Sequence, residues 1–252
     1  MAFVKYFADN VHNNLTVLPK NFIKNVGECM KKILIIWDFD GVIADSEHLW
    51  IKSWVQALKK LKGIELNNEQ QEYYLKGKAE KDIFALLKQD FPNIEFAEDF
   101  QKALHADDFY LMQNEMKMTC GIENILADNN FRHCIATGAT TAENNLKLQI
   151  LHLEKYFPPE TRFTIDQVKF GKPAPDLFLF AGAKMKYPPN NSVVIEDSPA
   201  GITAAKAAGM RVIAYIGASG NHNERYAELC RKSGADHIID NMPKIHNLLN
   251  NL

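Results

Sequence analysis

Asp38 and Asp40 stand two residues apart, directly after an apolar run that ends at Trp37. Successive side chains of a strand point to opposite faces, so residues two apart can project toward the same site. One carboxylate can then act as a nucleophile and the other as a general acid and base. Gly41 allows the sharp change of backbone direction that such a site needs. An Asp-x-Asp-Gly turn also ends strands in proteins without catalysis, so this motif alone leaves both interpretations open.

A second acidic pair, Glu196 and Asp197, follows another apolar run. Adjacent like charges repel each other unless a cation or hydrogen bonds offset them. A divalent ion would offset this repulsion, and hard oxygen ligands select magnesium over zinc. The same residues also suit a helix start, with Asp197 or Ser198 as the cap and Pro199 at the first helical position. Both interpretations can hold together, because a capped helix and a metal site can share one strand end.

Two further motifs carry groups that could bind a phosphate. Lys172 stands between Gly171 and Pro173, which fix it in place, and fixed cations are what a transferring phosphoryl group needs. Thr137 and Gly138 end an apolar run before a helical stretch, where a hydroxyl and free N–H groups form an anion site. A loop lysine and a helix cap are the ordinary alternatives. Taken together, the four motifs predict a phosphoryl-transfer site.

The elements that must position these motifs are strands alternating with helices from residue 31 onward. Such alternation predicts an α/β fold with a Rossmann-like parallel sheet flanked by helices. Ligands bind such sheets outside the carboxyl ends of the strands, where three of the four motifs fall. The expected strands are 33–36, 133–136, 192–195, 211–215 and a weaker one at 237–239. The expected helices between them are 141–151, 176–184, 199–208 and 222–232.

The alternation is interrupted once, between residues 46 and 119, where only helical periodicity is found. The first helix there is indicated by apolar residues at 4-4-3 spacing and a glycine stop, namely Trp50, Trp54, Leu58, Leu61 and Gly63. Two more helices are indicated around 83–87 and 100–111. We therefore expect an inserted all-helical cap domain at 47–118, a catalytic α/β core at 31–46 and 119–252, and a helical extension at 1–30. The extension is expected to pack on the core, with a partner or dimer contact as the alternative.

The composition is that of an ordinary globular protein, so any positive charge that binds a phosphorylated substrate must be local. Its 252 residues are 46% hydrophobic and 24% charged, with a net charge of -2 and a pI of about 6.5. Nothing in these values favours nucleic acid or a membrane as partner. The four cysteines are far apart, which argues against a zinc site or disulfide framework: Cys29, Cys120, Cys134 and Cys230. We expect a cytoplasmic protein that is a monomer or a weak dimer.

With these motifs in this order, the chain resembles the haloacid dehalogenase superfamily of phosphohydrolases and mutases. The resemblance covers residues 33 to about 215 and rests on Asp38-Phe39-Asp40-Gly41-Val42 with Asp45-Ser46-Glu47, Thr137-Gly138, Gly171-Lys172-Pro173-Ala174-Pro175-Asp176 and Glu196-Asp197-Ser198-Pro199-Ala200-Gly201. It implies that Asp38 attacks the substrate phosphorus to form an aspartyl-phosphate, and that Asp40 protonates the leaving oxygen and then activates water. It also implies a Mg²⁺ site formed by the Asp38 carboxylate, the Asp40 backbone carbonyl, Asp197 and, directly or through water, Glu196. The implied phosphate-binding groups are Thr137, the Gly138 amide and Lys172.

The resemblance also narrows the class of substrate and the residues expected to contact it. Asp40 argues for phosphate esters, because the dehalogenases and phosphonate-cleaving members lack an acid there. In phosphoglycolate phosphatase-like and β-phosphoglucomutase-like members a cap loop reaches the substrate, which makes Gly77 and Lys78 candidate substrate contacts, with exposed helix-boundary residues as the alternative. The leading interpretation is a magnesium-dependent phosphatase of small phosphorylated metabolites. A sugar-phosphate mutase shares every motif, and a non-catalytic binding or effector protein on the same fold is the alternative from another class.

Overall fold

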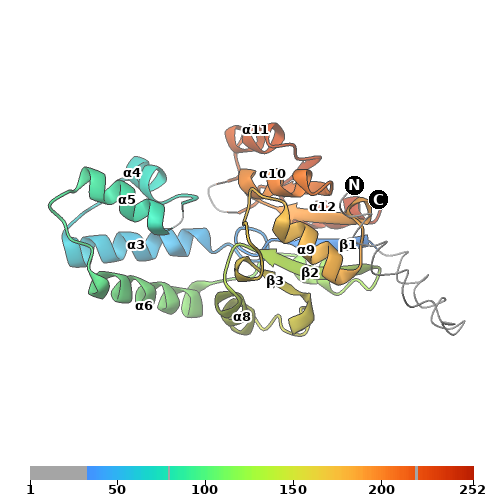
Figure 1. The fold of residues 1–252 in the computed structure, drawn as a ribbon, viewed down its shortest axis with the longest axis horizontal. Coiled ribbons are helices and arrows are strands. Elements are labelled where there is room, and N and C mark those ends of the chain that lie inside the picture. Colours follow the sequence, from blue (N-terminus) through green and yellow to red (C-terminus); the bar gives the residue numbers. More distant parts are fainter. Residues whose placement is uncertain (1–32, 79, 219–220) are drawn as a thin grey trace, which may run out of the picture.

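The structure is a computed structural model and describes residues 33–78, 80–218 and 221–252. The expected extension at 1–30 lies outside the described residues. A six-stranded parallel sheet in the order β3-β2-β1-β4-β5-β6 forms the centre of the α/β part (Figure 1). Its strands are β1 (Ile33–Trp37), β2 (Phe131–Thr137), β3 (Arg162–Thr164), β4 (Ser192–Glu196), β5 (Arg211–Tyr215) and β6 (His237–Ile239).

Helices cover both faces of the sheet, which explains why its central strands are apolar throughout. Alternate residues of β1 separate into two hydrophobic clusters: Ile35 and Trp37 pack on one face, Leu34 and Ile36 on the other. The first face is covered by α7 (Ile122–Leu126), α8 (Thr141–Ile150) and α12 (Met242–Leu249). The second is covered by α9 (Asp176–Met185), α10 (Pro199–Ala207) and α11 (Glu224–Lys232). Single 3₁₀ turns lie at Pro159–Thr161, Ile165–Gln167 and Pro189–Asn191.

The central strand β1 pairs with β2 on one side and β4 on the other, and this fixes where the motifs meet. Trp37 is the register partner of Ile135 in β2 and of Ile195 in β4. The Asp38 amide continues the ladder by donating to the Ile195 carbonyl at 2.9 Å. Directly below the site, the indole N–H of Trp37 donates to Nδ1 of His133 at 3.1 Å. Burial lowers the pKa of His133 to about 4, so its ring is neutral and can accept this bond.

The strand β3 and the exposure of Leu61 differ from what the sequence predicts. β3 was not expected, because three residues at the edge of the sheet are too few to show a strand periodicity. Leu61 was expected on the buried stripe of the first cap helix but is 43% exposed. The buried stripe of that helix runs along Leu49, Ser53, Trp54, Ala57 and Leu58, so its drift around the axis leaves Leu61 facing solvent.

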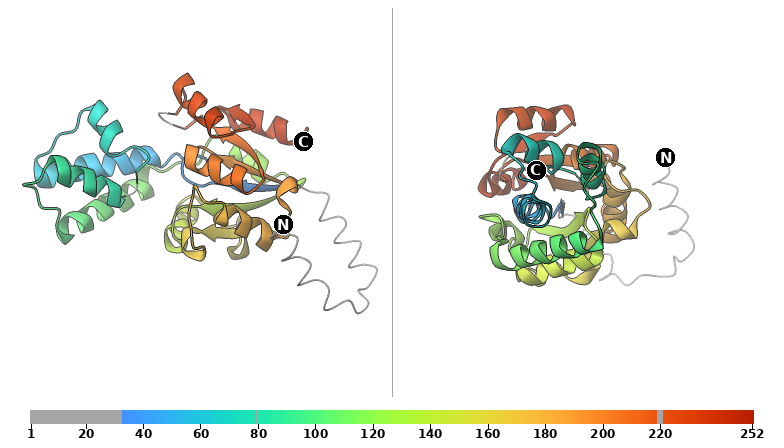
Figure 2. Two further views of the ribbon diagram at one scale, coloured as in Figure 1. Left: turned by 45° about the horizontal axis from the view of Figure 1, so that its top comes forward. Right: turned by 90° about the vertical axis from the view of Figure 1, so that its left-hand side faces the viewer.

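The helical insertion is confirmed and has a hydrophobic cluster of its own. It consists of α3 (Glu47–Lys62), α4 (Asn68–Tyr74), α5 (Glu80–Asp90) and α6 (Glu98–Glu115). Its buried residues include Trp54, Leu58, Ile83, Leu87, Phe100 and Leu104. Figures 1 and 2 show these helices set beyond one end of the sheet, with α3 and α6 leading to and from the core. Gly63 ends α3 in the left-handed conformation, as expected.

The two connections between cap and core lie side by side. Ala44 forms an antiparallel bridge to Met118, and the Thr119 amide donates to the Ile43 carbonyl at 2.8 Å. The Thr119 hydroxyl also donates to the Val42 carbonyl at 2.7 Å. These contacts lie at the expected junctions near residues 46 and 119, although the domain boundaries themselves stay a prediction. No helix among the described residues is long and apolar enough to cross a membrane.

Candidate active site

The motifs meet at one cavity of about 550 Å³ at the carboxyl end of the sheet. Asp38 follows β1, Thr137 ends β2, and Asp197 follows β4, so all three reach the cavity from adjacent strands. Lys172 reaches it from the loop before α9. Trp50 and Lys78 of the helical insertion line the opposite wall. The structure thus brings together groups that lie far apart in the sequence.

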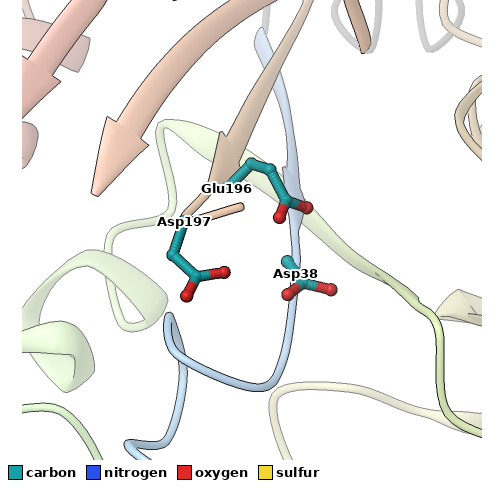
Figure 3. Close-up of side chains that lie close together, drawn as sticks. All are labelled: Asp38, Glu196 and Asp197. Atoms are coloured by element: carbon teal, nitrogen blue, oxygen red, sulfur yellow. The ribbon is translucent and has the colours of Figure 1, made fainter. Parts of the chain in front are cut away.

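Three carboxylates at the carboxyl ends of β1 and β4 have a geometry that suits a divalent cation. Asp38, Glu196 and Asp197 each offer an oxygen, and these oxygens all lie within 4.8 Å of one another (Figure 3). Burial, together with the charge of Glu196, raises the pKa of Asp38 to about 7. Burial and the charges of Glu196 and Asp38 raise the pKa of Asp197 well above its usual value. A cation bound here would offset the free-energy cost of ionising Asp38 and Asp197. An all-oxygen donor set fits Mg²⁺.

Lys172 is the cation that this cluster already contains. Its ammonium donates to Asp38 Oδ1 at 2.7 Å and to Glu196 Oε2 at 2.6 Å. Burial opposes the charge of Lys172, but the two carboxylates outweigh burial and raise its pKa, so it stays protonated. The other oxygen of Glu196 accepts bonds from the Ser198 amide and hydroxyl. Glu196 is therefore held on both oxygens, whereas the carboxylate of Asp197 accepts, from the described residues, one long bond of 3.3 Å, donated by Asn221.

The carboxylate of Asp40 lies apart from that cluster and has its own partners. The ammonium of Lys147, on α8, lies 2.6 and 2.8 Å from the two oxygens of Asp40. The Ser46 hydroxyl donates to the same carboxylate. Burial opposes the ionisation of Asp40, but Lys147 and Ser46 outweigh it and lower the pKa of Asp40. Sequence reasoning missed Lys147, because a lysine on a surface helix carries no local sign of its partner.

The Thr137–Gly138 segment presents an open surface to the cavity. Thr137 is buried, and its hydroxyl accepts a bond from the Ala139 amide at 3.1 Å. The cap of α8 is Thr140, which forms a capping box with Glu143, so Thr137 is not needed for that role. A Cβ on Gly138 would meet no atom within 4 Å, so the space above it is free for a ligand. This arrangement is compatible with phosphate binding, and the assignment stays a prediction.

The two candidate substrate contacts in the helical insertion, Gly77 and Lys78, have different positions. Lys78 lines the cavity, as a substrate contact must. Gly77 does not line it, and its amide instead donates to Glu47 Oε1 at 2.7 Å while its φ is +66°. Gly77 thus fixes Glu47, which does line the cavity, and the left-handed turn there favours glycine.

Asp197 is held by a segment that sequence reasoning did not identify. The side-chain amide of Asn221, which is 2% exposed, donates to Asp197 Oδ2. The Tyr226 hydroxyl, on α11, donates to the Asp197 backbone carbonyl at 3.1 Å. Both residues follow β5, the neighbour of β4 in the sheet. No local pattern could have identified them, since the contact arises from strand order.

Comparison with known proteins identifies the family of the chain. A sequence model of the haloacid dehalogenase-like hydrolases matches residues 35–215. The chain is 28% identical over 182 residues to a phosphorylated carbohydrates phosphatase of Thermotoga maritima, spanning 71% of this chain and 82% of that protein. It is 31% identical over 199 residues to (DL)-glycerol-3-phosphatase 2 of Arabidopsis thaliana, spanning 71% and 77%.

Solved structures agree with this match. A haloacid dehalogenase-like protein of unknown function from Agrobacterium tumefaciens superposes with a TM-score of 0.75 and 26% identity, covering 87% of this chain and 98% of that one. A putative beta-phosphoglucomutase from Thermotoga maritima superposes with a TM-score of 0.73 and 26% identity, covering 87% and 99%. The family match spans both strand-end carboxylate motifs and the helical insertion between them. The chain belongs to the haloacid dehalogenase-like hydrolase family.

Proposed function

We propose that the protein is a magnesium-dependent phosphatase of small phosphorylated metabolites that acts through an aspartyl-phosphate on Asp38. The observation that carries this proposal is the close group of Asp38, Glu196 and Asp197 with Lys172, placed at the cavity where the strands end. The named relatives act on phosphate esters, which agrees with such a site. Positioning and electrostatic stabilisation are the main contributions that phosphoryl transfer needs from a protein.

In the first step, an oxygen of Asp38 bonds to phosphorus while the bond from phosphorus to the leaving oxygen breaks. Asp40 gives a proton to that leaving oxygen, for which its carboxylate must first take up a proton and leave the Lys147 ion pair that holds it ionised in the free site. In the second step, Asp40 takes a proton from water, the water oxygen bonds to phosphorus, and the Asp38–phosphorus bond breaks. Lys172 already touches Asp38, so it is placed to offset charge on the phosphoryl oxygens, with Thr137 and the Gly138 amide as further donors.

We propose Asp38, Asp197 and the Asp40 backbone carbonyl as the residues that hold Mg²⁺, with Glu196 beside them. When bound, the cation would neutralise charge on the phosphoryl group and orient it. Because Glu196 already accepts bonds on both oxygens, its contribution is to fix Lys172 and to add negative charge.

Exchange of the nucleophile tests the proposal. Asp38→Asn keeps the size of the side chain and removes its nucleophilic charge, so Mg²⁺-dependent phosphate release from p-nitrophenyl phosphate should stop. The matched control is Asp107→Asn on α6, since Asp107 does not line the cavity. An Asp38→Asn enzyme that retains turnover, with circular dichroism like the wild type, would show that Asp38 is not the nucleophile.

A sugar-phosphate mutase is the second candidate, favoured by the likeness to the putative beta-phosphoglucomutase. In a mutase, a sugar hydroxyl and not water receives the phosphoryl group. Incubation with β-glucose 1-phosphate separates the two activities: a phosphatase releases inorganic phosphate, whereas a mutase yields glucose 6-phosphate. A non-catalytic protein would gain nothing from burying this set of charges, whose desolvation is costly.

The partners and location that we propose follow from the same features. The net charge of -2 gives no general attraction to nucleic acid, and the cavity of about 550 Å³ has the size expected for a small-molecule site. Cys120, Cys134 and Cys230 are free thiols, of which the last two are buried. Free thiols suit a reducing compartment, so we propose a cytoplasmic protein that is a monomer or a weak dimer.

A further inference from the structure

The wall of the cavity beyond the phosphate-binding residues carries charges of both signs. Four carboxylates line it, from α3, α5, α6 and α8: Glu47, Glu80, Asp108 and Glu143. Two ammonium groups, Lys78 and Lys147, line the same cavity. A substrate bound through its phosphate would extend its alcohol portion toward this wall, because the cavity continues there. The chemistry of the wall therefore bears on which alcohol the ester contains.

Of the two lysines, only Lys78 has no ion pair among the described residues. Lys147 is paired with both oxygens of Asp40 at 2.6 and 2.8 Å, and its side chain is only 13% exposed. Lys78 lies over the ring of Tyr73, with 5.9 Å from its nitrogen to the ring centroid. Once Lys147 is counted against Asp40, a single lysine faces four carboxylates. A carboxylate or second phosphate on the substrate would meet net negative charge.

Three of the four carboxylates are held by neighbours, which fixes their positions. Glu47 accepts the Gly77 amide at 2.7 Å, and Glu80 lies 2.7 Å from Nε2 of His105. Glu143 accepts the Thr140 amide and hydroxyl at 2.7 and 2.8 Å. These bonds restrain the side chains against the cavity wall. A wall that is fixed before binding loses less entropy when a ligand arrives.

Asp108 differs from these three, because it has no hydrogen-bond partner among the described residues. It lines the cavity from α6, opposite α8, and is partly buried. Burial raises its pKa to about 6, so it is mainly ionised at neutral pH. A partly buried carboxylate without a donor is costly, and a ligand that supplies a donor relieves that cost.

We propose that the substrate is the phosphate ester of a neutral, hydroxyl-rich alcohol, and that Asp108 accepts a hydrogen bond from one of its hydroxyl groups. This inference rests on the proposed function. A hydroxyl group donates one bond and accepts others, so a polyol can satisfy both the carboxylates and Lys78. The indole of Trp50, on the same wall, offers an apolar surface for the C–H groups of the alcohol.

An alcohol that carries an ammonium group is the main competitor, since four carboxylates attract a cation. Three of those carboxylates already have hydrogen-bonding neighbours, and Lys78 stands among them and repels a second positive charge. A neutral polyol avoids both repulsions, whereas an anion or a cation meets one of them. The mixed charge of the wall therefore favours a neutral leaving group.

Matched pairs of esters test the charge of the alcohol portion on the wild-type enzyme with Mg²⁺. Glycerol 3-phosphate and 3-phosphoglycerate differ only in a terminal CH₂OH or carboxylate, as do sorbitol 6-phosphate and 6-phosphogluconate. We expect kcat/KM to be about tenfold or more higher for the alcohol in at least one pair, from one repulsive contact of about 1.4 kcal/mol. Equal or reversed values in both pairs would overturn the inference, as would faster hydrolysis of phosphoethanolamine than of both alcohols.

The second arm tests Asp108 itself. Asp108→Asn should raise KM for the preferred alcohol ester about tenfold, with a smaller change in kcat, as expected for loss of a hydrogen bond to a charged group. Asp107→Asn, one residue away on α6 and outside the cavity, should change neither value. Unchanged KM in Asp108→Asn would remove Asp108 from the substrate site.

The proposed function can fail separately from this inference. If p-nitrophenyl phosphate and all four natural esters yield no Mg²⁺-dependent phosphate, the protein is not a phosphatase. If p-nitrophenyl phosphate is hydrolysed but the acids equal or exceed the alcohols, only the polyol inference is wrong.

Discussion

Replacement of Lys147 by methionine is expected to destabilise the protein by leaving Asp40 without its cation. Methionine keeps most of the apolar stem, which places the Lys147 nitrogen 5.8 Å from the centroid of the Phe39 ring, and removes only the charge. The ammonium contacts both Asp40 oxygens, at 2.6 and 2.8 Å, and the Lys147 side chain is 13% exposed. The perturbation is therefore the loss of one close, largely buried ion pair.

The magnitude follows from how far solvent screens the pair. Breaking a fully buried pair costs about 3–5 kcal/mol, and an exposed pair is worth about 0.2–1 kcal/mol. The Asp40 side chain is 36% exposed, so screening places the pair between these limits. We expect Lys147→Met to lower the free energy of unfolding by about 2 kcal/mol.

The pH for the measurement follows from the two pKa shifts. The lowered pKa of Asp40 contributes stability above its unfolded value of 3.8, and this is lost as pH falls through the folded pKa. The raised pKa of Lys147 contributes stability below 10.5, and this is lost as pH rises through its folded pKa. Both contributions are complete at pH 7.

A double-mutant cycle at pH 7 isolates the pair. Urea unfolding of the wild type, Lys147→Met, Asp40→Asn and the double variant should give a coupling free energy of about 1–2 kcal/mol. Lys88→Met, on an exposed position of α5, is the control and should change stability by less than about 0.5 kcal/mol. A coupling free energy below about 0.5 kcal/mol would refute the assignment of Lys147 as the counterion of Asp40.

Three further predictions address the metal site, the packing beneath it and the cap. Asn221→Ala should weaken Mg²⁺ binding about tenfold in titration calorimetry, because Asp197 loses its donor, and equal affinity would contradict that role. Gly201→Ala should destabilise the protein by about 2 kcal/mol in thermal or urea unfolding, because the new Cβ would lie 2.1 Å from Glu196 Cδ; an unchanged midpoint would show that Glu196 can move. KM for a polyol ester should rise as pH falls through about 6, because Asp108 then gains a proton. Asp108→Asn should lose that step, and its persistence in the variant would show that Asp108 is not the group responsible.

Much of the fold could be predicted because each central strand is a short apolar run that ends in a polar motif. The runs before Asp38, Thr137 and Asp197 become β1, β2 and β4, and their adjacency in the sheet brings the motifs together. The sequence contains the motifs but not that adjacency. A parallel sheet could have placed another strand between β1 and β4, which would have separated Asp38 from Asp197.

What could not be predicted depends on single long-range contacts. Lys147 lies 107 residues from Asp40, and Asn221 lies 24 residues from Asp197. Each is one polar residue that no periodicity or motif distinguishes from its neighbours. The position of Gly77 could not be predicted either, because it depends on a contact with Glu47, which lies 30 residues away. The left-handed turn at Gly77 directs its amide to Glu47 and not into the cavity.

Direct detection of a phosphorylated Asp38 would test the central claim most closely. The enzyme is mixed with Mg²⁺ and a hydrolysed ester, quenched within the first turnovers, and treated with borohydride, which reduces an acyl phosphate to an alcohol. Peptide mass spectrometry should then find homoserine at position 38 in the wild type and none in Asp38→Asn. Steady turnover with no modification at position 38, or with modification at another carboxylate, would contradict the assignment of Asp38 as the nucleophile.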